Sequence, residues 1–574
     1  MKKLIGEPAS VVNDMVAGLV RADDRLRRVD GQPVIVRADA QRLAARGQVA
    51  LISGGGSGHE PAHAGYVGAG MLTAAVLGEV FTSPSVDTVL AAIEAVTGPA
   101  GCLLIVKNYT GDRLNFGLAA AIARSRGRMV DMVLVDDDAA LAGGGRVGRR
   151  GLAGTVLIHK LAGAAAQEGR PLGEVGAIAQ AAITRLRTMG VALSPCTVPI
   201  AGKPNFELGA REMELGLGIH GEPGMARLDL EPAPVIVERM LETILAQGTC
   251  DPAGDPLVLL VNGLGGTPAM ELTIIAGMAL AALEERGFRV VRAGVGNYLT
   301  ALEMAGCSLS LLPATPGDLM RLDAPAAATA WQALTVAGGT APLPMDAAGT
   351  GSRDLRGPRL DQRGAAAVEM LTRSAIDTLI ACEADLTELD RKVGDGDLGI
   401  SLARGAQAVA AELEGLPSDC PAALLDHVSA IVRRSIGGTS GPVSAALFLG
   451  MATHLATIEG EIGLPDWTAA VEAGCASIRQ IGGAERGDRT MLDALLPAVE
   501  ALAEAHREGA SAPRALRAAA DAAMAGADAT AEVAAALGRA SYLGARAIGH
   551  PDPGARAVAL VLRAMAKRLG EERP

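Results

Sequence analysis

Four aspartates crowd one short segment of the chain, DLTELDRKVGDGDLG, and these are Asp385, Asp390, Asp395 and Asp397. Carboxylates this close repel one another unless a cation or hydrogen bonds offset the repulsion. Mg²⁺ is usually held by one or a few carboxylates together with substrate phosphates. The segment therefore predicts nucleotide-phosphate chemistry, in a chain that has no Walker-type GxxxxGK(S/T) loop. A charged, solvated turn at a helix end is the alternative that this segment alone leaves open.

A glycine-rich loop supplies a second candidate site. In SGGGSGHEPAH (53–63) three consecutive glycines follow a predicted strand, QVALIS (48–53). Glycine lets backbone N–H groups approach a ligand closely and adopts positive φ without strain, so such a loop can hold hydroxyls or phosphates. His59 follows directly and is available for proton transfer near neutral pH. A tight structural turn is the alternative.

Two further segments place reactive side chains beside glycines. VKNYTGDRLNFG (106–117) carries Lys107 at the end of a predicted strand and Asp112 in the turn after it. Together these would supply a cationic donor and a base for an alcohol, or an ordinary surface ion pair. LGLGIHGEPG (215–224) holds His220, whose imidazole could be a nucleophile toward a ligand carbonyl or a structural side chain.

The composition limits the classes of partner. The 574 residues predict about three to four domains. The net charge is 52 − 64 = −12 without a basic block, which argues against nucleic acid or an anionic membrane as a partner. Seven scattered cysteines without a CxxC pair indicate reduced thiols in the cytoplasm. The opening MKKLIGEPASVVNDM lacks the apolar run of a secretory signal, and we expect no membrane span.

The elements that must position these residues change character along the chain. Residues 1–335 alternate short β-rich runs, glycine turns and helical patterns, which is typical of an α/β sheet with ligand-binding residues just after its strands. Residues 336–362 are rich in Gly and Pro without periodicity and predict a linker. Residues 363–574 repeat apolar positions at three- and four-residue spacing, which predicts an all-helical domain.

Seven motifs in a fixed order carry a family resemblance. They are GGGSGHEP, VKNYTGDRLNF, GIHGEPG, LTELDRKVGDGDLG, GGTSGP, RGDRTMLDALLP and GRASYLGARAIGHPDPGA. Over nearly its whole length the chain resembles the single-chain ATP-dependent dihydroxyacetone (glycerone) kinases. The resemblance implies a ketose-binding half of two α/β subdomains at 1–335, a linker at 336–362, and an ATP-binding barrel of antiparallel helices at 363–574.

The resemblance also implies roles for residues in the N-terminal half. His220 matches the histidine that binds the ketone as a covalent hemiaminal, which would exclude glycerol because glycerol has no carbonyl. His59 and Asp112 match the acid/base pair that takes the proton from the attacking hydroxyl. The positions that match residues holding the substrate's oxygens are Gly56, Ser57, Gly58, His59, Lys107 and Asp112.

In the C-terminal half, Asp390, Asp395 and Asp397 match the carboxylates that hold two Mg²⁺ ions, whereas Asp385 lies outside this trio. The positions that match nucleotide-binding residues are Leu398, Gly399, Ile400, Ser401, Thr439, Ser440, Gly482, Met491, Arg539, Asp552, Pro553 and Gly554. Leu398 departs from the polar or small residue usual there, so a backbone contact to phosphate would survive and a side-chain contact would not.

The expected activity is transfer of the γ-phosphate of ATP to dihydroxyacetone, giving dihydroxyacetone phosphate. Several alternatives stay open: glyceraldehyde or a four-carbon ketose such as erythrulose as substrate, phosphorylation fed by a phosphocarrier, an FAD-cleaving activity that forms cyclic FMN, and a non-enzymatic co-regulator. The family implies a homodimer through the ketose-binding half. Catalysis could pair the two domains within one chain or between chains.

Overall fold

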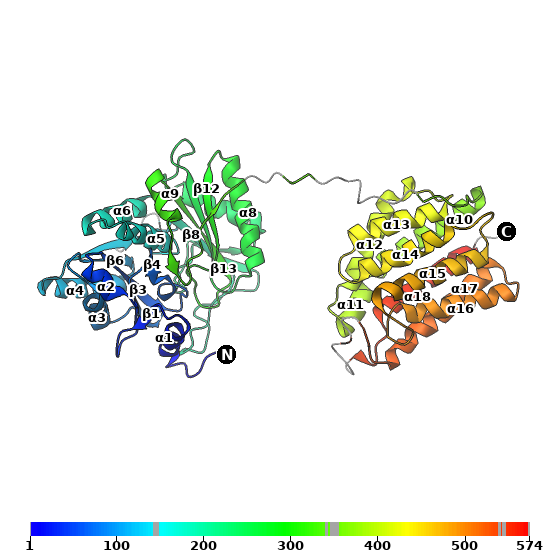
Figure 1. The fold of residues 1–574 in the computed structure, drawn as a ribbon, viewed down its shortest axis with the longest axis horizontal. Helices are drawn as coiled ribbons and strands as arrows, with labels where there is room; N and C mark the ends of the chain where they lie inside the picture. Colours follow the sequence, from blue (N-terminus) through cyan, green and yellow to red (C-terminus); the bar gives the residue numbers. More distant parts are fainter. Residues whose placement is uncertain are drawn as a thin grey trace. The chain divides into compact units, whose positions relative to one another are not determined.

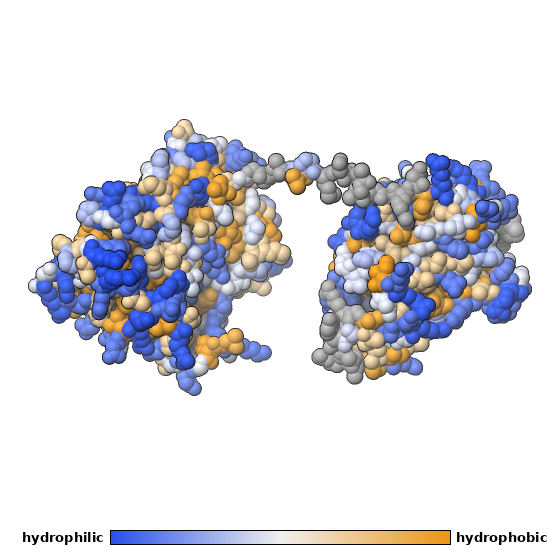
Figure 2. All heavy atoms as spheres, viewed as in Figure 1, coloured by the Kyte–Doolittle hydropathy of each residue, from blue (hydrophilic) through white to orange (hydrophobic). Residues whose placement is uncertain are grey.

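The computed structural model describes residues 2–141, 148–338, 342–344, 355–537, 541 and 547–571. The chain divides into two compact units, Met1–Ala341 and Pro342–Pro574 (Figure 1). Hydrophilic side chains cover much of the face of each unit seen in Figure 2, with apolar residues scattered among them. Within the described ranges, no helix combines the length and apolar character needed to cross a membrane.

The first sheet of the N-terminal unit has the strand order β1-β2-β5-β3-β6-β7. Its strands are β1 (Leu26–Arg28), β2 (Val34–Arg37), β3 (Ala50–Ser57), β5 (Ala74–Val80), β6 (Cys102–Lys107) and β7 (Val130–Val135). The four strands from β5 to β7 in this order are parallel, and β1 and β2 add an antiparallel edge. All residues of β3 and β6 are buried, as expected for parallel strands covered on both faces.

Helices cover both faces of this sheet (Figure 1). On one face lie α1 (Val11–Ala22), α5 (Thr155–Gln167) and α6 (Leu172–Arg185), and on the other α2 (Ala40–Ala45), α3 (Val86–Val96) and α4 (Thr110–Ser125). Successive strand side chains alternate between the two cores. Leu51 packs with α5 and α6, whereas Ala50 and Ile52 pack with α3 and α4.

A second, mostly antiparallel sheet has the order β10-β9-β8-β13-β11-β12-β15. Its strands are β8 (Arg187–Ala192), β9 (Glu212–Leu215), β10 (Ala226–Asp229), β11 (Leu257–Gly263), β12 (Val290–Gly296), β13 (Gly306–Pro313) and β15 (Thr335–Val336). One face is covered by α7 (Ala233–Leu245) and α8 (Ala269–Glu285). The other face shares a core with α5 and α6, beside α9 (Pro316–Asp323). A small pair, β4 (Gly68–Ala69) and β14 (Ala327–Ala328), completes the unit.

The described part of the C-terminal unit is all helical, as predicted. Its α-helices are α10 (Gln362–Ala381), α11 (Glu383–Val393), α12 (Leu398–Glu412), α13 (Pro421–Ser435), α14 (Ser440–Leu455), α15 (Leu464–Gly482), α16 (Leu492–Arg507), α17 (Ala512–Ala529) and α18 (Pro553–Glu571). From α12 to α18 each helix packs against the next, and α10 packs against both α12 and α18, which closes the ring. Short connections make the neighbours from α12 to α17 antiparallel, so α12, α14 and α16 begin at the same end. The start of α18 lies beside the start of α16, because a Cβ added at Gly554 would lie 3.7 Å from Met491.

Small residues allow these helices to approach closely. A Cβ added at Gly450 of α14 would lie 2.7 Å from the Ala473 carbonyl oxygen of α15. Buried alanines fill the contacts among α16, α17 and α18, including Ala498, Ala519 and Ala559. A sequence with 2% aromatic residues thus builds its core from close backbone approach, where dispersion contacts between small side chains and backbone replace large rings.

Candidate functional site

The glycines at the end of β3, Gly54–Gly56 together with Gly58, form what we call the glycine floor of the candidate site. Sheet pairing extends β3 beyond the predicted strand 48–53, because the glycines up to Gly56 pair with β5. A Cβ added at Gly55 would lie 2.6 Å from Lys107 Nζ and 3.4 Å from Asp112 Oδ2. At Gly58, whose φ is +98°, it would lie 2.8 Å from the Phe81 ring. Side chains here would displace the ammonium group and the aromatic wall, so glycine is required.

His59 presents one unpaired nitrogen. Its Nδ1 lies 2.7 Å from the Thr300 carbonyl oxygen, and since a carbonyl only accepts, Nδ1 carries the proton. Nε2 is buried and has no hydrogen-bond partner among the described residues. Burial, with the nearby charges of His220 and Lys107, holds the pKa of His59 well below its usual value. The imidazole is therefore neutral, and Nε2 offers a lone pair to a ligand hydroxyl.

His220 comes from the second sheet and meets His59 edge to face. The loop after β9 brings its ring centroid to 4.8 Å from that of His59, 4.8 Å from that of Tyr109 and 5.2 Å from that of Phe81. Its Nδ1 lies 2.8 Å from Glu222 Oε1. About a fifth of the His220 side chain is exposed, 21%, so a small ligand can reach it while the surrounding rings exclude most water.

Lys107 and Asp112 are both buried beside this floor. Lys107 Nζ lies 2.8 Å from His63 Nε2, and Asp112 Oδ1 accepts a short hydrogen bond from the Ser83 hydroxyl. Burial lowers the pKa of Lys107, and the negative charge of Asp112 opposes that shift. The Ser57 hydroxyl donates to the Gly78 carbonyl at 2.7 Å, so Ser57 can meet a ligand through its backbone or a hydroxyl lone pair.

Behind Lys107 lies a chain of buried polar groups that the sequence did not predict. The Ser53 hydroxyl donates to the Ile105 carbonyl at 2.6 Å, so its lone pairs remain for His63 Nδ1 at 3.4 Å and His159 Nε2 at 3.2 Å. Those nitrogens must then donate. His63 consequently keeps a lone pair on Nε2, which accepts from Lys107. Burial lowers the pKa of His159 to about 3.

The acidic trio comes together at the junction of α11 and α12. One carboxylate oxygen from each of Asp390, Asp395 and Asp397 lies within 4.8 Å of the others. Asp390 is buried, and its Oδ2 accepts hydrogen bonds from the backbone N–H groups of Asp397 at 2.9 Å and Leu398 at 3.1 Å. Asp385 lies exposed in the first turn of α11. Three convergent hard oxygen donors suit Mg²⁺.

The nucleotide-binding positions predicted from the resemblance cluster at helix starts. Leu398, Gly399, Ile400 and Ser401 form the first turn of α12, Thr439 and Ser440 begin α14, and Asp552, Pro553 and Gly554 begin α18. Met491 precedes α16, and a Cβ added at Gly554 would lie 3.7 Å from it. Unpaired N–H groups at helix N-termini favour anions. Gly482 ends α15, and Arg539 lies outside the described residues.

Known proteins match both units. Residues 17–330 match the Dak1 domain, and residues 392–567 match the DAK2 domain. A protein of Solanum lycopersicum described as a putative 3,4-dihydroxy-2-butanone kinase is 45% identical over 100% of this chain and 98% of its own. A Bos taurus triokinase/FMN cyclase is 44% identical over 99% of both chains. The chain belongs to the dihydroxyacetone kinase family. A solved structure of a family member, the C. freundii dihydroxyacetone kinase in complex with AMP-PNP and Mg²⁺, matches with a TM-score of 0.66 and 37% identity over 99% of each chain.

Membership of the dihydroxyacetone kinase family confirms the resemblance inferred from the motifs, and the α/β and all-helical architecture agrees with it. Sequence reasoning missed several residues that surround the candidate site. They are Ser53, His63, Phe81, Ser83, Tyr109, His159, Glu222 and Thr300. Glu222 stands two positions after His220 in the same motif, so a search for an orienting partner of the histidine could have found it.

Proposed function

We propose that this chain transfers the γ-phosphate of ATP to dihydroxyacetone, with the ketone held as a hemiaminal on His220. The observation that carries the proposal is the geometry of His220. Its Nδ1 lies 2.8 Å from the Glu222 carboxylate, so Nε2 is the nitrogen with a free lone pair. The ring centroid of His220 lies 4.8 Å from that of His59. An imidazole with a free nitrogen beside a glycine floor is suited to attack a small carbonyl compound.

Covalent capture would add the imidazole of His220 to the carbonyl group of the ketone. The Nε2 lone pair forms a bond to the carbonyl carbon, and the C=O π pair moves to the oxygen. The oxygen takes up one proton and becomes a hydroxyl. The ring releases one proton from Nδ1, so the total number of protons does not change. Glycerol has no carbonyl carbon to attack, so the chemistry as well as the pocket excludes it.

Two buried side chains, His59 and Asp112, support the proposed removal of the proton from the attacking hydroxyl. His59 Nε2 is neutral, buried and without a partner among the described residues, so it can accept a hydrogen bond from the substrate. Asp112 is held by Ser83 and lies beside the same floor as Lys107. We assign proton abstraction to this pair, and we assign oxygen binding to Lys107 and to the backbone of Gly56, Ser57 and Gly58.

The acidic trio fits two Mg²⁺ ions bound with ATP, with Asp390, Asp395 and Asp397 as the protein ligands. Bound Mg²⁺ would neutralise charge that develops on the transferred phosphoryl group. The first turn of α12, Leu398–Ser401, together with Thr439 and Ser440, would bind the phosphate oxygens. Gly482, Met491, Arg539 and Asp552–Gly554 would line the rest of the nucleotide site.

A second activity and a wider substrate range are suggested by what the relatives are described as doing. The bovine relative is described as a triokinase/FMN cyclase and the tomato relative as a 3,4-dihydroxy-2-butanone kinase. We therefore extend the proposal to glyceraldehyde, to four-carbon ketoses such as erythrulose, and to formation of cyclic FMN from FAD. We also propose a homodimer through the N-terminal half.

Steady-state kinetics of His220→Ala test the proposal. We expect kcat/KM for dihydroxyacetone to fall by at least about 100-fold, since catalysis loses its covalent anchor, while KM for ATP stays unchanged. Discrimination against glycerol should shrink. His506→Ala, at an exposed position in α16, is the matched control. Unchanged affinity and selectivity in His220→Ala would refute covalent capture.

A further inference from the structure

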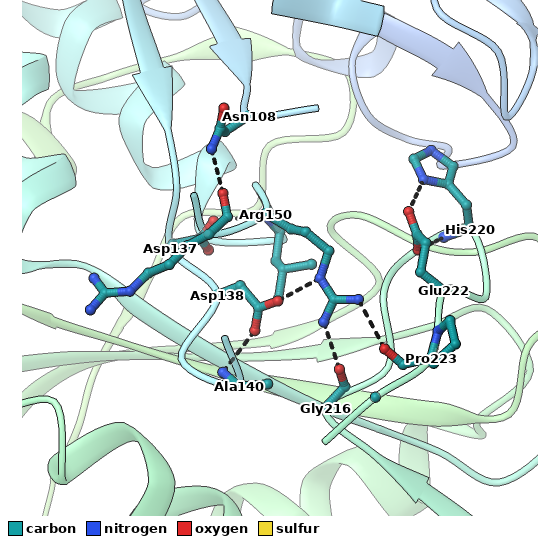
Figure 3. Close-up of polar contacts among 12 residues, drawn as sticks. Asn108, Asp137, Asp138, Ala140, Arg150, Gly216, His220, Glu222 and Pro223 are labelled. Atoms are coloured by element: carbon teal, nitrogen blue, oxygen red, sulfur yellow. Dashed lines mark hydrogen bonds and ion pairs between the residues drawn. The ribbon is translucent and has the colours of Figure 1, made fainter. Parts of the chain in front are cut away.

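A buried arginine binds both ends of the loop that contains His220 (Figure 3). Arg150 Nε pairs with Asp138 Oδ2 at 2.6 Å. Its two terminal nitrogens donate to the Gly216 carbonyl at 2.7 Å and the Pro223 carbonyl at 3.5 Å. These two carbonyls bracket the loop, so the guanidinium fixes both of its ends. Asp138 in turn accepts from the Ala140 N–H at 2.9 Å.

Inside the clamped loop, Glu222 folds back onto His220. Its Oε1 lies 2.8 Å from His220 Nδ1, and its Oε2 accepts from the His220 backbone N–H at 3.1 Å. A Cβ added at Gly218 would lie 2.0 Å from Glu222 Oε2 and 2.6 Å from Arg150 Nη1. The absent side chain at Gly218 thus leaves space for the carboxylate and the guanidinium. In Figure 3 the second ring nitrogen of His220 points away from Glu222.

We propose that Glu222 is a positioning residue that sets the reactive tautomer of His220 and balances the charge of its ketone adduct. A carboxylate accepts and does not donate, so Nδ1 carries the proton and Nε2 keeps the lone pair. Burial alone would raise the pKa of Glu222, but the hydrogen bond and charge of His220 bring it below its usual value, which keeps the carboxylate ionised. This inference rests on the proposed function, because it assumes that His220 Nε2 attacks the ketone.

The new bond places a positive charge on the imidazole ring. When Nε2 bonds to the carbonyl carbon, the ring becomes cationic until the Nδ1 proton leaves. A carboxylate at 2.8 Å stabilises that cation, as the orienting carboxylate of serine proteases stabilises the imidazolium, and here it is also close enough to accept the Nδ1 proton. A neutral residue at 222 would lack both effects. A glutamine would retain an acceptor oxygen without the charge.

The experiment uses the full chain with ¹⁵N-labelled histidine and ¹³C-labelled carbonyl carbon in dihydroxyacetone. The chain has eight histidines, so NMR can resolve their tautomers, with His220→Ala assigning the His220 signals. In the wild type we expect a proton on Nδ1 and a tetrahedral ketone carbon. In Glu222→Ala we expect mixed tautomers, a weakened tetrahedral signal and kcat/KM for the ketone down about 100-fold, within the range for lost orienting partners of histidines. KM for ATP should not change.

Glu222→Gln separates charge from shape and should lose about tenfold in kcat/KM, because the pair loses its charge-assisted character. Glu231→Ala, which removes an ion pair with Arg239 at 2.6 Å, is the control and should behave as wild type. Wild-type tautomer, adduct and kcat/KM in Glu222→Ala would overturn the inference. If that variant does not fold, wild-type kcat/KM in Glu222→Gln would overturn it. Absence of the tetrahedral signal in the wild type would instead refute the proposed function.

Discussion

Acidification should destabilise the N-terminal unit through His159, whose imidazole lies buried behind Lys107. The pKa of this histidine is about 3 in the folded chain against 6.5 for an ordinary histidine, and burial is the largest cause. Because the folded pKa is depressed, the unfolded chain binds the proton more readily between these values. Stability contributed by the neutral ring is therefore present above pH 6.5 and is lost as the pH falls below it. Between pH 7 and pH 5 the loss for this one group is about 2 kcal/mol.

Urea denaturation at pH 7 and pH 5 measures this loss. The chain has two tryptophans. Trp331 packs against the core that contains α5, and Trp467 packs in the C-terminal unit. A Trp467→Phe background therefore reports the N-terminal unit alone. His159→Gln keeps a donor toward Ser53 but cannot titrate, so its pH dependence should be about 2 kcal/mol smaller than that of the parent. His506→Gln, at an exposed position, should match the parent. Equal pH dependence in His159→Gln and the parent would refute the reasoning.

Two further variants test the two sites separately. Asp395→Asn should abolish Mg²⁺-dependent turnover and leave the ketone adduct unchanged, as judged by kinetics and ¹³C NMR, because one ligand of the cation site is lost; normal turnover would contradict the metal assignment. Gly55→Ala should lower kcat/KM for the ketone by about 100-fold. Its Cβ would lie 2.6 Å from Lys107 Nζ, so the ammonium group must move away, and a misplacement of about 1 Å can cost about 100-fold. Gly277→Ala, where an added Cβ meets nothing within 4 Å, is its control.

The order of strands and helices follows largely from the pattern of residues. Apolar runs such as the one ending at Ser53 are strands because both faces of the first sheet are covered by helices. The continuation of β3 through Gly56 was not predictable from propensity, since glycine disfavours strands. Pairing with the neighbouring strand β5 overrides that preference.

The candidate site was predictable only as separate pieces. Their places beside glycine-rich turns identify His59 and His220 as candidates, but those places do not predict that the two rings meet at 4.8 Å, because that contact depends on how two sheets pack. His63 ends the glycine-rich segment 53–63 and His159 lies in no motif, and only their contacts with the buried Ser53 hydroxyl give them a role. The acidic trio was the easier case, since its members are close in sequence and the start of α12 brings them together.

Covalent capture of the ketone by His220 can be observed directly. The most direct measurement is the one-bond coupling between the ¹³C-labelled ketone carbon and ¹⁵N-labelled Nε2 of His220 in the full chain. Covalent capture predicts a tetrahedral carbon coupled to that nitrogen in the wild type, and no coupled signal in His220→Ala. A bound ketone that keeps its carbonyl carbon uncoupled in the wild type, at concentrations that saturate turnover, would contradict it.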